Sequence, residues 1–290
     1  MRNLIVIICL NCFSVFAQLP ETEIFLTDIE IKNNLIKIEK AQNINIHKGY
    51  NNQPFFMPDG KSILFSSETN TKGKIHICKY EIKSKKTKKL TATQTSEYSP
   101  ALAPDGVSIS AVVVEEDSAQ RVWLYDLNTG AKKSCLHEGT DSIGYYAWLG
   151  KDTIVYYKLT NPHSLRVLNS KTGEDNWLCD NPTRSFKKIS ETVFFYVIRE
   201  EKQNLIYFFD IRTKKTTLFA TDKPENQDYV WQTDLGLVKS EQNKIYHYST
   251  ETKVWAKVAD FSSFGIKKIT RFAFSPDKKR MAVVSNLDEK

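Results

Sequence analysis

Five histidines, and the three of the five cysteines that lie after residue 17, are the residues that could hold a metal ion or carry out redox chemistry. They are His47, His76, His137, His163, His247, Cys78, Cys135 and Cys179. None follows the HxH, HExxH or CxxC spacing that would place ligands together on one local element. We therefore predict no metal site and no cofactor, and interpret the cysteines as small hydrophobic residues in strands. A single bridge between two of them is the alternative.

Three aspartates recur in one local setting. Asp59, Asp105 and Asp277 each follow a proline, and the first two precede a glycine. Pro and Asp begin turns, and Gly accepts the positive φ that a turn requires. Catalysis would need the three carboxylates to converge in one cleft, so we predict a structural role and no catalytic residue. The turn residues are Pro58, Asp59, Gly60, Pro104, Asp105, Gly106, Pro276 and Asp277.

The chain is mildly basic, with a formal net charge of +7 over 290 residues. Much of this charge lies in one run, formed by Lys83, Lys85, Lys86, Lys88 and Lys89. We interpret the run as a solvated hairpin turn, and contact with an anionic surface is the alternative. Nucleic-acid binding is not expected, because the chain also carries an export signal.

That signal is the N-terminal segment. Arg2 precedes an uninterrupted apolar run over residues 4–10, and small residues end at Ala17. This pattern predicts a signal peptide over residues 1–17, with cleavage before Gln18. The apolar run is shorter than the roughly 20 residues that span a bilayer, and no later segment is long enough either. We therefore expect an exported protein, periplasmic or secreted, that does not span the membrane.

The turn motifs are parts of a repeat that organises the chain. Each Pro-Asp turn is followed by an apolar run, as in residues 63–65, 109–114 and 281–284. Fainter copies begin near residues 147, 188 and 230. Each unit continues with a strand, a small polar turn and another strand. A unit of about 43 residues and four strands has the size of one propeller blade.

The two ends of the chain determine the number of blades. The last repeat stops after its inner hairpin, while residues 24–38 supply an outer pair without an inner hairpin. Together they complete one blade, so the sequence predicts an all-β, six-bladed β-propeller over residues 18–290. Its blades are four-stranded and antiparallel, and N-terminal outer strands complete the last blade. An open stack of sheets would leave strand edges exposed at both ends.

Residues 51–65 resemble the PD-type, WD-repeat-like propeller repeat of the TolB-like family. The consensus runs Asp-x-x-Pro-x-Phe-Ser-Pro-Asp-Gly-Lys before a strand, and the resemblance covers nearly all of residues 18–290. It implies a propeller in the bacterial cell envelope. The Asp that opens the consensus is Asn51 in the first copy and Glu97 in the second. The partner of TolB is therefore not transferred to this chain.

Related repeats also occur in enzymes. In prolyl-oligopeptidase-like enzymes they precede a hydrolase domain with a Gly-x-Ser-x-Gly turn, and this chain has no such motif. Oligogalacturonate lyases of a related repeat type assemble metal ligands from distant blades. A glycan-binding or metal-assisted glycan-cleaving propeller, with its site in the central channel, is therefore the alternative function.

The loops that enter the innermost strands are the predicted binding region. These loops face one end of the central channel and carry Tyr50, Asn51, Glu97, Tyr98, Tyr145, Arg184, Tyr229 and Arg271. Tyr and Arg offer large contact area and directional donors, which suits recognition. We therefore favour a monomeric, non-catalytic propeller that docks a protein or peptide of the cell envelope, with a glycan as the alternative ligand.

Overall fold

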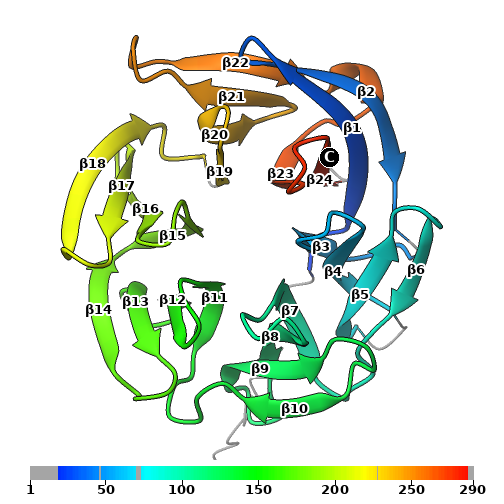
Figure 1. Ribbon diagram of the computed structural model, residues 1–290, viewed down its shortest axis with the longest axis vertical. Helices are drawn as coiled ribbons and strands as arrows, with labels where there is room; N and C mark the ends of the chain where they lie inside the picture. Colours follow the sequence, from blue (N-terminus) through cyan, green and yellow to red (C-terminus); the bar gives the residue numbers. More distant parts are fainter. Residues whose placement is uncertain (1–18, 46, 70–72, 227, 287–290) are drawn as a thin grey trace, which may run out of the picture.

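The computed structural model describes residues 19–45, 47–69, 73–226 and 228–286, so the predicted signal peptide lies outside the described residues. The described residues form six sheets of four antiparallel strands, arranged in a ring (Figure 1). The predicted six-bladed β-propeller is thereby confirmed. We number the blades 1 to 6 by the order of their innermost strands along the chain.

The strand bounds follow the repeat. Blade 1 contains β3 (Asn51–Phe56), β4 (Ser62–Glu68), β5 (Ile75–Glu81) and β6 (Lys86–Lys89), and blade 2 contains β7 (Ser96–Leu102), β8 (Ser108–Val114), β9 (Gln120–Asp126) and β10 (Lys132–Cys135). Blade 3 contains β11 (Ile143–Trp148), β12 (Thr153–Lys158), β13 (Ser164–Asn169) and β14 (Asp175–Asp180), and blade 4 contains β15 (Pro182–Lys188), β16 (Val193–Arg199), β17 (Asn204–Asp210) and β18 (Lys215–Asp222). Blade 5 contains β19 (Tyr229–Gln232), β20 (Gly236–Glu241), β21 (Lys244–Tyr248) and β22 (Trp255–Asp260), and a 3₁₀ turn, η1 (Ser262–Phe264), leads to blade 6.

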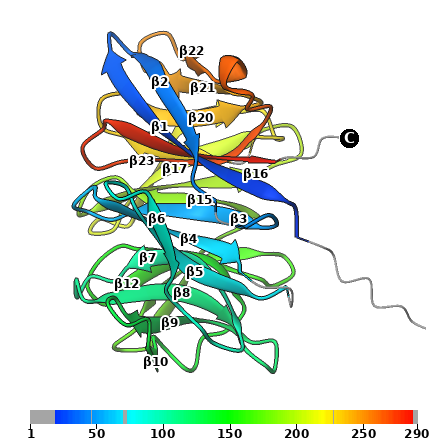
Figure 2. The ribbon, with the colours of Figure 1, turned by 90° about the vertical axis from the view of Figure 1, so that its right-hand side faces the viewer.

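Blade 6 is built from both ends of the described chain. Its strand order is β2 (Leu35–Asn43), β1 (Thr22–Lys32), β24 (Arg280–Asn286) and β23 (Ile269–Phe274). Strands β1 and β24 pair antiparallel, with Thr22 opposite Asn286 and Asp28 opposite Arg280. The blue and red strands accordingly lie side by side in Figure 2. The prediction that N-terminal outer strands complete the last blade is confirmed.

Burial explains why each repeat contains an uninterrupted apolar run. The second strand of each blade lies between two other strands and between neighbouring blades, so nearly all residues of β4 and β8 are buried. A strand covered on both faces is apolar without alternation, as in Ile63-Leu64-Phe65. The outermost strands face solvent, and β6 carries the exposed end of the lysine run.

The hydrophobic core lies between neighbouring blades. Ile24 of β1 packs with Phe65 of β4 across the junction of blades 6 and 1. Phe195 of β16 packs with Tyr229 of β19 across the junction of blades 4 and 5. Burying a side chain of this size stabilises the folded state by about 1.5–3 kcal/mol. Each blade is therefore held mainly by its two neighbours.

The Pro-Asp segments form the turns between the first and second strands of their blades. The Oδ1 atom of Asp59 accepts a hydrogen bond from the Lys61 backbone N–H at 2.9 Å. The Oδ1 atom of Asp105 accepts two, from Val107 at 2.9 Å and Ser108 at 2.8 Å. Asp277 accepts one from Lys279 at 3.1 Å. These contacts account for the recurrence of aspartate at this position.

Candidate functional site

A central cavity of about 380 Å³ lies inside the ring and is lined by residues from all six blades. One repeat position contributes a residue from every blade. It stands five residues before the first residue of the inner turn, such as Pro58, Pro104 or Pro276. The six residues at this position, which we call the channel ring, are Gln53, Ser99, Tyr145, Ser185, Asp228 and Arg271.

Bulges in the innermost strands place this ring. The pairing register shifts just before or at the ring residue, between Tyr98 and Ala101 in β7 and between Ile269 and Arg271 in β23. A bulge bends its strand and changes the direction of a side chain. Gln53 and Ser99, each followed by proline, adopt left-handed φ values of 59° and 53°.

Three ring side chains join neighbouring blades. Gln53 Oε1 accepts a hydrogen bond from the Ser99 backbone N–H at 2.7 Å. Ser185 Oγ accepts one from Tyr229 at 3.1 Å, and Asp228 Oδ2 accepts one from Phe272 at 2.9 Å. In each case the donor lies on the innermost strand of the next blade. These contacts stabilise the ring and hold the cavity wall in one shape.

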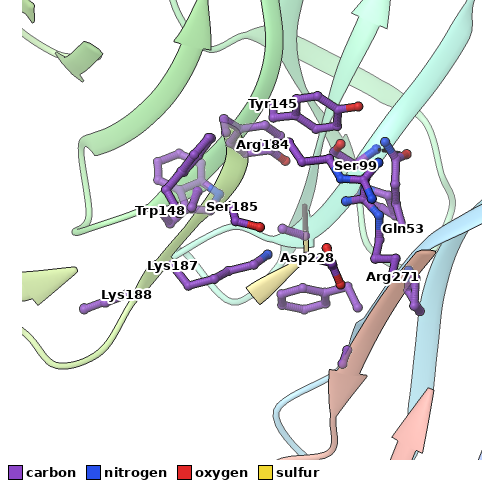
Figure 3. A pocket seen from close by; sticks show the side chains of 18 of the residues that line it. Gln53, Ser99, Tyr145, Trp148, Arg184, Ser185, Lys187, Lys188, Asp228 and Arg271 are labelled. Atoms are coloured by element: carbon purple, nitrogen blue, oxygen red, sulfur yellow. Dashed lines mark hydrogen bonds between the residues drawn. The ribbon is translucent and has the colours of Figure 1, made fainter. Parts of the chain in front are cut away.

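Two arginines reach across the opening of the cavity. Arg184 lies on β15, and its Nη2 donates to the backbone oxygen of Thr270 in blade 6 at 2.5 Å. Arg271 lies on β23, and its Cζ is 5.5 Å from the ring centroid of Tyr145 in blade 3. Figure 3 shows the two arginines and Tyr145 together at one side of the cavity. The Nε atoms of both arginines are buried and have no hydrogen-bond partner.

Positive charge predominates in the cavity. Burial lowers the pKa of Arg184, Arg271 lowers it further, and Asp228 and Tyr145 oppose the decrease. The enclosing channel wall and the charge of Arg271 also lower the pKa of Lys187, although water reaches its side chain. Asp228, which Lys187 faces in Figure 3, opposes this decrease. Asp228 is the one carboxylate among the lining residues. Anionic groups are therefore the ligands that the cavity charge favours.

Of the eight residues predicted for the channel mouth, Tyr145, Arg184, Tyr229 and Arg271 line the cavity. Tyr229 is 1% exposed, and its hydroxyl donates to Asp222 Oδ2 at 2.8 Å, so its polar atom points away from the cavity. Tyr145, Arg184 and Arg271 form what we call the mouth cluster.

Tyr50 and Tyr98 lie beside this cluster. Their rings pack edge to face, with centroids 6.0 Å apart. Burial raises the pKa of the Tyr50 hydroxyl, and the positive charge of Arg271 opposes that increase. The pair supports the wall of the mouth, and neither tyrosine is among the residues that line the cavity.

Asn51 and Glu97 lie elsewhere, and both are fully buried. Asn51 Nδ2 donates to the backbone oxygens of His47 at 3.0 Å and Thr22 at 3.2 Å. Glu97 accepts hydrogen bonds from Thr91, Thr93 and Thr95 and contacts His76 Nδ1 at 3.0 Å. Both side chains tie loops to strands, so a partner could not touch them without opening these networks. We leave them out of the candidate site.

Sequence reasoning missed Gln53, Ser99, Ser185, Lys187 and Asp228, all of which line the cavity. The predicted mouth residues stand at the start of each innermost strand. Because of the bulges, the number of residues between that start and the cavity differs between blades. Counting back from the inner turn avoids the bulges and would have found the whole channel ring.

The histidines and cysteines lie away from the cavity. His76 is bonded to Glu97, His137 Nδ1 lies 2.9 Å from Thr140 Oγ1, and none of the five histidines lines the cavity. Cys78, Cys135 and Cys179 are free thiols. Within the described ranges, no three His, Cys, Asp or Glu side chains gather in a way that could hold a metal ion.

Comparisons of the sequence and of the structure with known proteins identify the type of propeller. No protein-family model matches the chain, and no curated protein matches it in sequence. Among solved structures, a TolB-type protein from Agrobacterium tumefaciens matches with a TM-score of 0.67, at 11% identity over 93% of this chain and 99% of that chain. The fold is that of a TolB-like six-bladed β-propeller.

Other TolB-like neighbours differ in what they do. TolB from Acinetobacter baumannii matches with a TM-score of 0.50 and 18% identity, over 70% of this chain and 52% of its own. An oligogalacturonate lyase in complex with manganese matches with a TM-score of 0.57 and 12% identity, over 88% and 83%. Identities this low establish the fold alone, because one fold serves many functions. No helix within the described residues is long and apolar enough to cross a membrane.

Proposed function

We propose that this chain is an exported, periplasmic or secreted binding propeller that docks a protein or peptide of the cell envelope without catalysis. The mouth cluster carries the proposal. Arg184, Arg271 and Tyr145 present directional donors and an aromatic surface around an opening whose wall is fixed by contacts between blades. Tyr and Arg at a rigid, partly desolvated site are typical of binding hot spots.

The closed ring supports this role. Loops and strand ends on a rigid scaffold can present a site without ordering on binding, which preserves affinity. Predicted export is consistent with a partner in the envelope. A glycan-binding or glycan-cleaving propeller remains the second candidate, because the positive charge of the cavity also suits an acidic glycan.

The test is crosslinking in cells followed by affinity capture of the tagged full-length chain from envelope fractions. We expect one dominant protein partner with the wild-type chain, and its loss with Tyr145→Ala or Arg184→Ala. Arg212→Ala is the matched control, since Arg212 is exposed at the outer hairpin of blade 4 and far in the fold from the innermost strands. Recovery of no protein above background, with retention of an acidic glycan, would replace the proposal with the glycan reading.

A further inference from the structure

The mouth cluster leaves hydrogen-bonding capacity unused. Arg184 Nε and Arg271 Nε are buried without a partner, and Ser99 Oγ, which lies on the channel ring, is buried and unpartnered as well. Buried polar groups are nearly always hydrogen-bonded, because leaving one unpaired costs its lost hydration. The residues that carry these atoms come from three different blades and line one cavity, which points to a ligand that supplies acceptors to the guanidinium groups there.

The charge balance indicates what the acceptor is. Arg271 is close enough to Arg184 to lower its pKa, and the neighbouring Asp228 already accepts the Phe272 N–H at 2.9 Å. A guanidinium presents its donors in a planar fork that matches the two oxygens of a carboxylate. A carboxylate would neutralise the like charges and accept hydrogen bonds from the guanidinium groups that line the cavity.

The wall of the cavity favours a peptide as the carrier of that carboxylate. The innermost strands β3, β7, β11, β15, β19 and β23 each form one edge of their sheet. Such edges present backbone N–H and C=O groups that an extended peptide can pair with. The lining also includes the apolar residues Phe55, Leu102 and Trp148. An apolar side chain next to the acidic residue would fit there.

We propose that Arg184 and Arg271 together bind a carboxylate of an extended acidic peptide segment inserted into the channel mouth. This inference rests on the proposed docking function and specifies its ligand. The guanidinium groups supply the paired donors, and Ser99 lies beside them in Figure 3. Lys187, also in the lining, adds a third positive charge, which faces Asp228 in Figure 3.

The experiment is selection from a display library of random heptapeptides on the immobilised full-length chain. We expect Asp and Glu to be enriched on the wild-type chain and the enrichment to disappear on Arg184→Gln and on Arg271→Gln. For a selected peptide, replacing its acidic residue by the amide should weaken binding about 10- to 100-fold, as expected for lost hydrogen bonds to charged groups. Arg271→Lys, which retains charge without the fork, should retain part of the preference. Arg212→Gln should match the wild type.

The outcomes separate this inference from the docking proposal. Selected peptides without acidic enrichment would overturn the carboxylate site and leave docking intact. An acidic preference that survives in both Arg→Gln variants, each shown by circular dichroism to be folded, would also overturn it. If no peptide is selected and an oligogalacturonate probe binds in an Arg184-dependent way, both proposals fail and the ligand is an acidic glycan.

Discussion

Arg184 and Arg271 are held near each other at the channel mouth although both carry positive charge. Arg184 bonds to the Thr270 carbonyl and Arg271 lies over the Tyr145 ring, yet neither forms an ion pair with a carboxylate among the described residues. In an enclosed site, such an arrangement costs stability unless a ligand neutralises it. Proteins accept this cost at sites where binding requires it. The arginines are therefore expected to destabilise the free protein.

This trade-off can be measured with Arg271→Met. Methionine keeps most of the aliphatic volume and removes the unpaired Nε and the repulsion of Arg184. Even after loss of the contact with Tyr145, we expect the free energy of unfolding to rise by about 1 kcal/mol. Urea denaturation followed by circular dichroism measures it, and Arg212→Met serves as the exposed control. A decrease in stability would show that Arg271 serves the fold rather than a ligand.

Lys187 gives the cavity a dependence on pH. Burial and Arg271 lower its pKa in the folded state, so the unfolded chain binds more protons between that value and the ordinary pKa of lysine. Stability therefore falls as pH decreases through the lowered pKa and is recovered above the ordinary one. We expect the wild-type chain to lose stability relative to Lys187→Met as pH falls from about 10.5 toward neutrality. Because Lys187 remains accessible to water in the cavity, the effect should be modest. A constant difference across this range would contradict the assignment.

At the scale of the elements, each innermost strand serves both the fold and the site. Its outer edge pairs within the blade and its free edge lines the cavity, and in three blades the ring residue also bonds to the next blade. The start of the strand belongs to a different network. In blade 2, Glu97 at the start of β7 binds Thr91, Thr93 and Thr95 of the preceding loop and His76 of β5 in blade 1.

This division of roles predicts opposite effects at neighbouring positions. Glu97→Ala leaves His76 and Thr91 buried without their shared acceptor and should lower stability by about 3 kcal/mol. Capture of the partner by the protein that remains folded should be unchanged, whereas Tyr145→Ala should abolish capture with little loss of stability. Glu116→Ala, at an exposed loop position, is the control for thermal unfolding. Loss of partner binding in folded Glu97→Ala would return Glu97 to the site.

The contrast between Glu97 and Ser99 shows how far the sequence could lead. Repeats reveal every blade, because a strand buried on both faces must be apolar and its turn must contain residues such as Pro58 and Asp59. They do not reveal which of two nearby residues faces the channel. A bulge between Tyr98 and Ala101 changes the direction of the side chains, and it has no sequence signature beyond the Ser-Pro pair. The charge at the mouth required the structure as well, since Arg184 and Arg271 come from blades 4 and 6.

The whole molecule depends on the junction in blade 6. There β1 joins strands from opposite ends of the described chain, and it is paired on both sides, to β2 and to β24. Each blade packs mainly on its two neighbours, so opening this blade exposes apolar faces of blades 5 and 1 at once. The channel ring also requires closure, because Asp228 binds the Phe272 N–H across the junction of blades 5 and 6. Fold and candidate site should therefore be lost together.

Leu26→Pro in β1 tests this cooperativity. Leu26 pairs with Gln42 on one side and Ala282 on the other, and proline removes a donor from the middle of the sheet, which should cost about 3 kcal/mol or more. Tryptophans report on blades away from the change, since Trp123, Trp148 and Trp177 lie in blades 2 and 3, which do not adjoin blade 6. The other two, Trp231 and Trp255, lie in the adjacent blade 5. If closure is cooperative, the tryptophan fluorescence of the variant should reach the unfolded value at a lower urea concentration than that of the wild-type chain. The fluorescence change and the loss of β-sheet circular dichroism should then occur in one transition. Leu19→Pro, at an exposed position before β1, should leave the transition unchanged. Retention of wild-type tryptophan fluorescence after loss of blade 6 would mean that the other five blades are stable as an open arc. Binding at the mouth cluster would then not depend on a closed ring.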